Sequence, residues 1–233
     1  MICLLLRQGF DPSAIAVRLA IRNALTGCDR VLDVGCGTSM NMRWFGVKHS
    51  TGVEGYGPAC EEAKRRKTHD ELVQSDIREL DRHFKPRQFD ACVALDVIEH
   101  LTKEDGLKLM ASMERIANKK IIFFTPSGFL IQHHYEQGDL QEHLSGWEPS
   151  EMEQHGYQVS GLLGPKSLRG EFHVIQKRPK VFWGFVSFLG HIFWTKRNPA
   201  KAAAILCVKT KITNPRNGFR RISHKKGIRM LAL

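Results

Sequence analysis

Short apolar runs alternate with amphipathic segments along the first half of the chain. The runs have the length of buried strands and the amphipathic segments have apolar residues at helical spacing, so we expect strands and helices in alternation. This order is typical of a parallel sheet that is covered by helices on both faces. The predicted strands are RVLDVG, STGVEGY, ELVQSDI, FDACVAL and KKIIFFTP, and the predicted helices span 11–27, a segment ending near 45, 58–67 and 103–117.

Beyond residue 126 the alternation becomes less regular. One more helix and strand are predicted over 148–164, and a last strand over 202–211. The chain length and the single run of strands favour one domain, followed by a tail rich in Arg and Lys. The predicted domain spans 1–213, its two inserted substrate-side or lid segments span 127–147 and 178–198, and the basic flexible tail spans 214–233.

A glycine turn, in the sequence VLDVGCGT, follows the first predicted strand. Ligands of parallel α/β sheets bind beyond the carboxyl ends of the strands, where this turn lies. Gly35 and Gly37 permit a close approach of the backbone to a ligand and positive φ angles. In the dinucleotide fingerprint G-x-G-x-x-G the third glycine is replaced here by Met40, and Asp33 before the turn favours a cationic ligand over a diphosphate.

Acidic residues also stand at the ends of the next three predicted strands. Glu54 can accept hydrogen bonds from both hydroxyls of a ribose. Asp76 can accept from an adenine amino group while Ile77 packs on the ring, and Asp96 ends the fourth strand. Together these positions describe a pocket for an adenosine that carries a positive charge.

The motifs VLDVGCGT, GVEGY, SDI and FDACVALDVIEHL resemble, in this order, those of class I S-adenosylmethionine-dependent methyltransferases of the bacterial small-molecule type. The resemblance is closest over residues 28–126. It implies a Rossmann-like seven-stranded sheet, mostly parallel with the last strand antiparallel, sandwiched by helices, and it implies S-adenosylmethionine as cofactor. The cofactor-binding residues that it implies are Asp33, Gly35, Cys36, Gly37, Glu54, Gly55, Asp76, Ile77, Leu95 and Asp96.

Two histidines are candidates for the side of the methyl acceptor. His100 follows Asp96 by one helical turn, and His143 lies in the loop after the fifth strand, where class I enzymes commonly admit the acceptor. If the acceptor is a hydroxyl, a histidine base helps to remove its proton, and His143 is the preferred catalytic candidate before His100. Packing roles are the alternative for both. The spacing of His133, His134 and His143 matches no standard zinc pattern, so no metal site is expected.

The composition indicates a cellular compartment and shows that the charge is unevenly distributed along the chain. The six cysteines are scattered without a C-x-x-C pair, which favours a reducing cytoplasm over a disulfide framework, and no signal peptide or spanning helix is expected. Residues 1–163 contain 19 basic and 23 acidic side chains, whereas residues 164–233 contain 16 and one. The net charge of +11 therefore arises in the C-terminal third, where it indicates an anionic partner or serves solubility alone.

The very apolar segment VFWGFVSFLGHIFW, residues 181–194, has two interpretations. As a helix it would be about 21 Å long, too short for the roughly 30 Å hydrocarbon core of a membrane. It either packs over the substrate cleft or a dimer interface, or lies in the surface of an anionic membrane with the basic residues of 177–197 beside it. The second interpretation suits a lipid- or glycan-linked acceptor.

We therefore predict a cytoplasmic methyltransferase, monomeric or homodimeric, that methylates a small-molecule or lipid/glycan-linked acceptor at oxygen, with peripheral contact to the inner membrane surface as an extension. An RNA/DNA- or protein-directed methyltransferase and a cofactor-binding protein without activity are the alternatives. The lack of an Asn/Asp-Pro-Pro-aromatic signature, and a tail with Phe219 as its one aromatic residue, argue against nucleic acid. The acidic set at four strand ends argues for an enzyme.

Overall fold

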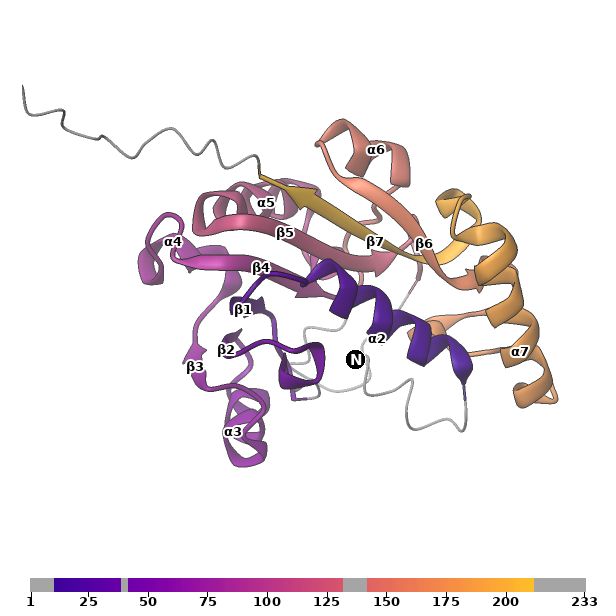
Figure 1. Cartoon of the computed structure of the whole chain (residues 1–233), viewed down its shortest axis with the longest axis horizontal. Helices are drawn as coiled ribbons and strands as arrows, with labels where there is room; N and C mark the ends of the chain where they lie inside the picture. The colour runs from indigo at the N-terminus through magenta and orange to yellow at the C-terminus, as the bar shows by residue number, and fades with distance from the viewer. Residues whose placement is uncertain (1–10, 39–41, 132–141, 212–233) are drawn as a thin grey trace, which may run out of the picture.

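A computed structural model of the chain describes residues 11–38, 42–131 and 142–211 (Figure 1). A seven-stranded sheet with the order β3-β2-β1-β4-β5-β7-β6 runs through the molecule. Helices lie on both of its faces. The strands are β1 (Arg30–Val34), β2 (His49–Glu54), β3 (Glu71–Gln74), β4 (Phe89–Leu95), β5 (Ala117–Pro126), β6 (Gln158–Pro165) and β7 (Ala202–Thr210).

The sheet is parallel from β3 to β5, and β7 is antiparallel to both of its neighbours, β5 and β6. The chain passes from β1 to β2 and β3 on one side and then returns to place β4 on the other side of β1. This reversal puts a switch point at the carboxyl end of β1, where open α/β sheets bind ligands. The predicted sheet, including its antiparallel last strand, is confirmed.

Two hydrophobic layers join the helices to the sheet. One layer packs α5 with α4 and α6 against one face, and the other packs α2 against the opposite face. Trp147 is fully buried in the first layer. The helices are α2 (Pro12–Ala24), α3 (Gly57–Arg66), α4 (Leu80–His83), α5 (Lys103–Ile116), α6 (Pro149–Gln154) and α7 (Lys180–Gly190).

Local capping explains where the helices begin. The Asp11 carboxylate accepts a hydrogen bond from the Ser13 amide at 2.9 Å, and Pro12 occupies the first turn of α2. Thr102 caps α5 in the same way. The segment predicted as a helix ending near residue 45 is, in its described part, a single 3-10 turn, η1 (Met42–Phe45), and Met40 lies outside the described residues.

The buried guanidinium of Arg169, in the connection after β6, ties α2, β6 and α7 together. Its Nη1 lies 2.9 Å from the Asp11 carboxylate, so the charge is paired, and the pKa of Arg169 is lowered by burial. Removing one partner of a buried ion pair leaves the other charge buried without compensation, and this destabilises the fold. Its other acceptors are the carbonyl oxygens of Leu163 and His173 and the hydroxyls of Ser13 and Ser187.

Asp70, immediately before β3, links η1, β2 and β3. It accepts hydrogen bonds from the amide and the hydroxyl of Ser50 in β2, at 2.8 and 3.0 Å, and from the guanidinium of Arg43. The hydrogen bond from Arg43, followed by that from the Ser50 amide, lowers the pKa of Asp70 to about 2.

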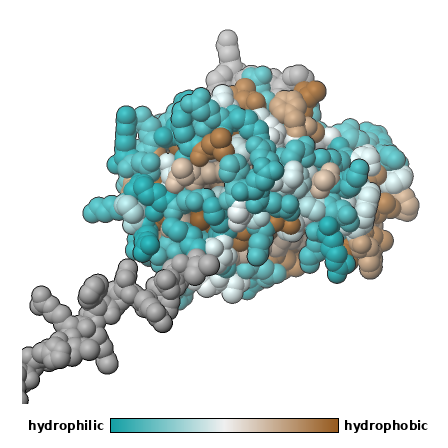
Figure 2. Space-filling model, turned by 90° about the horizontal axis from the view of Figure 1, so that it is seen from above, coloured by the Kyte–Doolittle hydropathy of each residue, from teal (hydrophilic) through white to brown (hydrophobic). Residues whose placement is uncertain are grey.

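Helix α7 stands beside the N-terminal half of α2, at the β6 end of the molecule (Figure 1). Gly184 and Ser187 lie on its buried face, and the chain continues into the π-helix η6 (His191–Thr195). Among residues 11–38, 42–131 and 142–211 no helix is long and apolar enough to cross a membrane. The opposite face is apolar yet exposed, and Figure 2 shows hydrophobic groups gathered at this end; they are Val181, Phe182, Phe185, Leu189, Ile192, Phe193 and Trp194.

Candidate active site

The glycine turn after β1 has the conformation that its residues permit. Gly35 and Gly37 have φ of +67° and +53°, a region that is unfavourable for side chains with a Cβ. A Cβ on Gly35 would lie 2.7 Å from Val97 Cγ2, so the turn packs against the segment that follows β4. A Cβ on Gly37 would meet no described atom within 4 Å, so this glycine borders open space. The turn thus offers bare backbone at the carboxyl edge of the sheet.

Glu54, at the end of β2, holds this turn in place. Its Oε2 accepts from the Gly37 amide and its Oε1 from the Tyr56 amide, both at 2.8 Å. Each carboxylate oxygen has a second lone pair, so Glu54 can accept two further hydrogen bonds. The sequence placed Glu54 and Gly37 in one pocket, and the structure puts them in direct contact.

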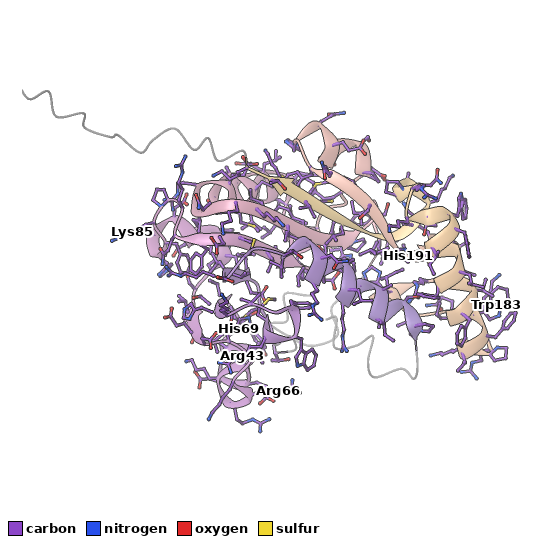
Figure 3. The ribbon with its side chains drawn as sticks, in the orientation of Figure 1. Arg43, Arg66, His69, Lys85, Trp183 and His191 are labelled. Carbon is purple, nitrogen blue, oxygen red and sulfur yellow. The ribbon has the colours of Figure 1, made fainter. Side chains whose placement is uncertain are left out.

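Asp33 lies beneath the turn and is buried with His69. Its Oδ2 is 3.1 Å from His69 Nε2, and His69 Nδ1 is 2.9 Å from the Thr68 hydroxyl. Figure 3 shows His69 near Arg66, whose guanidinium donates to the Thr38 carbonyl at 2.8 Å. His69 precedes β3 outside every motif, so its contact with Asp33 could not be predicted from the sequence pattern.

Cys36 contributes backbone rather than thiol chemistry. Its Sγ fills the space above Gly52, where a Cβ would lie 2.7 Å from it, and the side chain is buried. Burial, followed by the charges of Asp33 and Glu54, raises the pKa of the Cys36 thiol far above its ordinary value. The thiol is therefore protonated and unreactive, and a small residue is all that the turn requires.

The adenine side of the predicted pocket is formed between β2 and β3. A Cβ on Gly55 would lie 3.5 Å from the Ser75 carbonyl oxygen, and the Ser75 amide donates to the Glu54 carbonyl at 3.1 Å. Asp76 caps the short helix η2 (Ile77–Glu79) by accepting from the Arg78 amide at 2.9 Å. The Arg78 side chain pairs with the same carboxylate and lowers its pKa, and Ile77 packs against the core.

At the end of β4, Leu95 is partly buried and packs against the second layer. Asp96 follows in a left-handed conformation, with φ of +55°, and its amide donates to the Phe124 carbonyl at 2.7 Å. Its Oδ1 lies 3.5 Å from His173 Nε2. His173 comes from the connection between β6 and α7, has a φ of +58°, and belongs to no sequence motif, so sequence reasoning missed it.

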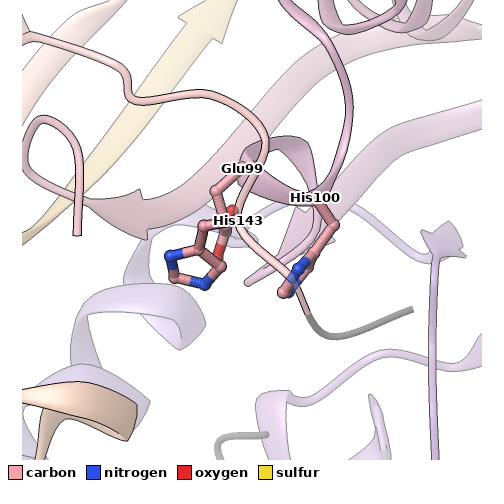
Figure 4. A group of neighbouring side chains, drawn as sticks. All are labelled: Glu99, His100 and His143. Atoms are coloured by element: carbon pink, nitrogen blue, oxygen red, sulfur yellow. The ribbon is translucent and has the colours of Figure 1, made fainter. Parts of the chain in front are cut away.

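The two candidate catalytic histidines meet beside Asp96. The ring centroids of His100 and His143 are 4.8 Å apart, with the rings edge to face. The side chain of Glu99 lies beside both rings (Figure 4). One ligand atom from each of these three side chains lies within 4.8 Å of the others. Glu99 directly precedes His100 in the DVIEH motif, and this adjacency could have indicated from the sequence that the two side chains belong to one site. His133 and His134, which the sequence also considered, lie outside the described residues.

Burial changes the protonation of this cluster. Burial, and then repulsion by Asp96, raises the pKa of Glu99 well above its ordinary value. Burial, and then the neighbouring His100, lowers the pKa of His143 to about 4. His143 is therefore neutral at pH 7, and since a general base works best with a pKa near the working pH, a pKa this low makes it a weak one.

The residues at this edge fit S-adenosylmethionine by their donor and acceptor chemistry. Gly37 leaves an open cradle of backbone, and the two oxygens of Glu54 can accept ribose hydroxyls. Asp76 and Ile77 offer an acceptor and an apolar surface for the adenine. Asp96, which follows β4, is the carboxylate that the resemblance places beside the sulfonium.

The strand order is that of the class I methyltransferase fold. Residues 32–124 match the family model described as a methyltransferase domain. This match and the shared fold support the superfamily of class I S-adenosylmethionine-dependent methyltransferases, which the motifs of the chain led us to expect.

Solved structures share this fold at low sequence identity. An S-adenosylmethionine-dependent methyltransferase from Archaeoglobus fulgidus superposes with a TM-score of 0.54 and 17% identity, over 84% of this chain and 94% of that one. The methyltransferase domain of a bacterial Hen1 protein, CtHen1-C, gives 0.52 and 19%, over 83% and 96%. Magnesium protoporphyrin IX methyltransferase from Synechocystis PCC 6803 gives 0.50 and 10%, over 85% and 84%. No curated protein sequence matches the chain.

Proposed function

We propose that this methyltransferase transfers the methyl group of S-adenosylmethionine to a hydroxyl of an amphiphilic small molecule, a lipid or a lipid-linked glycan at an anionic membrane surface. The observation that supports the acceptor class is the exposed apolar face of α7 and η6, which is flanked along the chain by Lys177 and Arg178 before it and by Lys196 and Arg197 after it. The cofactor residues named above have the roles that the family resemblance implies for them.

The chemistry at the carboxyl edge requires few protein groups. S-adenosylmethionine supplies an electrophilic methyl group on a positively charged sulfur. The acceptor oxygen forms a bond to the methyl carbon while the carbon–sulfur bond breaks, its pair of electrons returns to sulfur, and the hydroxyl proton leaves to a base or to water. The protein positions the acceptor and excludes water. We assign His100 and His143 to the acceptor side, because they stand beside Asp96 at the end of β4.

The α7 face has the composition of an interfacial helix. Phe182, Leu189 and Phe193 are exposed to 58%, 51% and 76% and recur every few residues on one side. From residue 177 to residue 201 the chain contains six basic and no acidic side chains. An amphipathic helix with large apolar side chains and basic flanks binds anionic lipid by insertion and charge attraction together. A lipid surface is therefore the occupant that we propose for this face.

Labelled cofactor tests the acceptor class directly. Purified enzyme is incubated with methyl-labelled S-adenosylmethionine and cell extract, and the label is then separated into lipid, small-molecule, protein and nucleic-acid fractions. We expect label in the organic, lipid-containing fraction, in a base-stable ether. Label in the protein or nucleic-acid fraction alone would overturn the acceptor class and leave the cofactor assignment intact.

Vesicle sedimentation tests the membrane surface separately. The full chain should bind vesicles with anionic lipid at low salt and bind neutral vesicles at least about tenfold less. The variant Phe182→Ser/Phe193→Ser should lose most of this binding. Leu107→Ser, which removes an exposed apolar side chain from α5, is the matched control and should bind like the wild type. Equal binding by both variants would refute the assignment of α7.

A further inference from the structure

Six buried polar side-chain atoms lie without a hydrogen-bond partner in the part of the chain that the structure describes, and three of them, all acceptors, belong to the edge beside β4. They are Asp96 Oδ1, Glu99 Oε1 and His143 Nε2. Burying such an atom without a donor costs about 1–3 kcal/mol, and more for a charged group, so a cluster of three calls for a ligand. Asp96 lies close enough to Glu99 and His143 for its charge to act on both of them.

The hydrogen bonds of both histidines orient the rings as metal ligands are oriented. His143 Nδ1 lies 2.7 Å from the Leu130 carbonyl oxygen, and His100 Nδ1 lies 2.9 Å from the Glu142 carbonyl oxygen. A carbonyl accepts only, so each Nδ1 must be the protonated nitrogen and each Nε2 holds the lone pair. In metal-binding histidines the N–H of the second ring nitrogen usually donates a hydrogen bond to a carbonyl or carboxylate in this way.

Glu99 is fixed as firmly as the histidines. The Thr125 hydroxyl at the end of β5 donates to Glu99 Oε2 at 2.9 Å, which leaves Oε1 for a ligand. The amides of Leu144 and Ser145 donate to the Glu99 carbonyl oxygen at 2.8 and 3.0 Å. The loop that contains His143 is therefore clamped to the Glu99 backbone, and the positions of the two side chains are coupled.

We propose that Glu99, His100 and His143 bind a divalent transition-metal ion of the zinc or manganese kind. Two imidazole nitrogens and a carboxylate oxygen leave coordination positions open in catalytic sites of Zn²⁺, Mn²⁺ and Fe²⁺. Mg²⁺ and Ca²⁺ prefer sets made of oxygen alone, so they fit this set less well. No metal site was expected from the sequence, because the spacing of His143 from His133 and His134 matches no zinc-binding pattern. In the fold, His143 lies next to the DVIEH segment instead.

A hydrogen bond between a protonated Glu99 and His143 Nε2 is the competing explanation. It would satisfy Glu99 and His143 and leave His100 outside the interaction. A cation would satisfy Glu99 Oε1 and His143 Nε2 together and would also use His100, whose ring stands next to that of His143. The two explanations differ in a measurable way, because only one of them predicts stoichiometric metal binding.

This inference rests on the proposed function for its role in catalysis, though not for the binding itself. An ion held by Glu99, His100 and His143 would lower the pKa of an acceptor hydroxyl bound to it, so that no separate histidine base would be needed. The acceptor oxygen would form its bond to the methyl carbon as the carbon–sulfur bond breaks with its electron pair returning to sulfur, and the hydroxyl proton would pass to solvent.

Metal binding is measured on the full-length protein after treatment with a chelator. Mn²⁺ binding is followed by electron paramagnetic resonance, Zn²⁺ binding by competition with a chromogenic chelator, and S-adenosylhomocysteine binding by calorimetry on the same samples. We expect one bound ion per chain, with affinity at least about tenfold lower in Glu99→Gln, His100→Gln and His143→Gln. His49→Gln is the matched control, because His49 faces a carboxylate, Glu71, at 3.5 Å without a second histidine.

The outcomes separate the metal site from the methyltransferase assignment. Stoichiometric binding of either ion that is lost in the three variants and kept in His49→Gln supports the site, whatever the cofactor result. No saturable binding of either ion, or equal binding by all variants, overturns it. Failure of S-adenosylhomocysteine binding in the wild type would count against the proposed function alone. His100 is only partly buried, so His100→Gln gives a folded variant if the two core substitutions misfold.

Discussion

Replacing Glu54 by Gln tests the cofactor pocket at one atom. In the wild type the two carboxylate oxygens accept from the Gly37 and Tyr56 amides at 2.8 Å, and each has one lone pair left for a ribose hydroxyl. The variant turns one oxygen into an NH₂ group, which faces a backbone N–H and cannot accept from it. One ribose hydrogen bond is lost, and the other becomes a bond between neutral groups.

The expected loss of binding free energy follows from the strength of hydrogen bonds to charged groups. Each is worth about 1.5–3 kcal/mol and a neutral one about 1 kcal/mol, so replacing two charged bonds by one neutral bond costs about 2–5 kcal/mol. Since 1.4 kcal/mol corresponds to tenfold, the Kd for S-adenosylhomocysteine should rise about 30- to 4000-fold. The lost backbone contact should also lower Tm by a few degrees.

Isothermal titration calorimetry at 25 °C measures the Kd, and circular dichroism on heating checks that the variant is folded. Glu62→Gln is the control, because Glu62 is an exposed carboxylate on α3 that pairs with Arg65. It should leave the Kd unchanged within about twofold. A folded Glu54→Gln protein that binds S-adenosylhomocysteine within threefold of the wild type would refute the role of Glu54 and the pocket built around it.

Three further substitutions test the scaffold. Gly35→Ala should lower the free energy of unfolding in urea by about 1–3 kcal/mol more than Gly27→Ala. Both glycines have a positive φ, but only a Cβ at position 35 would meet a neighbouring side chain. Equal losses in the two variants would contradict this. Arg169→Met should lower Tm by about 6–20 °C, from about 3–5 kcal/mol for a broken buried pair, and a drop below 3 °C would contradict it. The lowered pKa of Asp70 means that its carboxylate stabilises the fold above about pH 4 and that this contribution fades as the pH falls through about 2. The deficit of Asp70→Asn in urea unfolding should therefore be full at pH 5–7 and shrink between pH 4 and pH 2, and a constant deficit down to pH 2.5 would show that the charge is not responsible.

Residue pattern and parallel topology explain why the sheet could be predicted. Apolar runs of strand length fix which segments are strands, and the alternation with helices makes them parallel, which brings their carboxyl ends to one edge. The acidic residues that follow the strands then fall near one another without any knowledge of side-chain contacts. The contact between Gly37 and Glu54 illustrates this, because it joins two strand ends that the sheet places side by side.

The helix caps could be predicted for a different reason. Asp11 followed by Pro12 specifies the start of α2 through contacts within a few residues, so no tertiary information is needed. The part of the predicted helix before residue 45 that the structure describes is only a 3-10 turn, because propensity does not decide how far a short segment continues.

The sequence by itself determined the order of strands and helices, the cofactor class and the strand ends that form its pocket, because these depend on local periodicity and on a topology that follows from it. Only the tertiary structure paired Asp33 with His69, buried Arg169 among three elements, and brought His143 to Glu99 and His100 from more than forty residues away. These contacts join loops, whose paths depend on the packing of the whole chain and have no periodic signature. The same packing turned one side of α7 inward and left its aromatic face exposed, a difference that the apolar run 181–194 does not reveal.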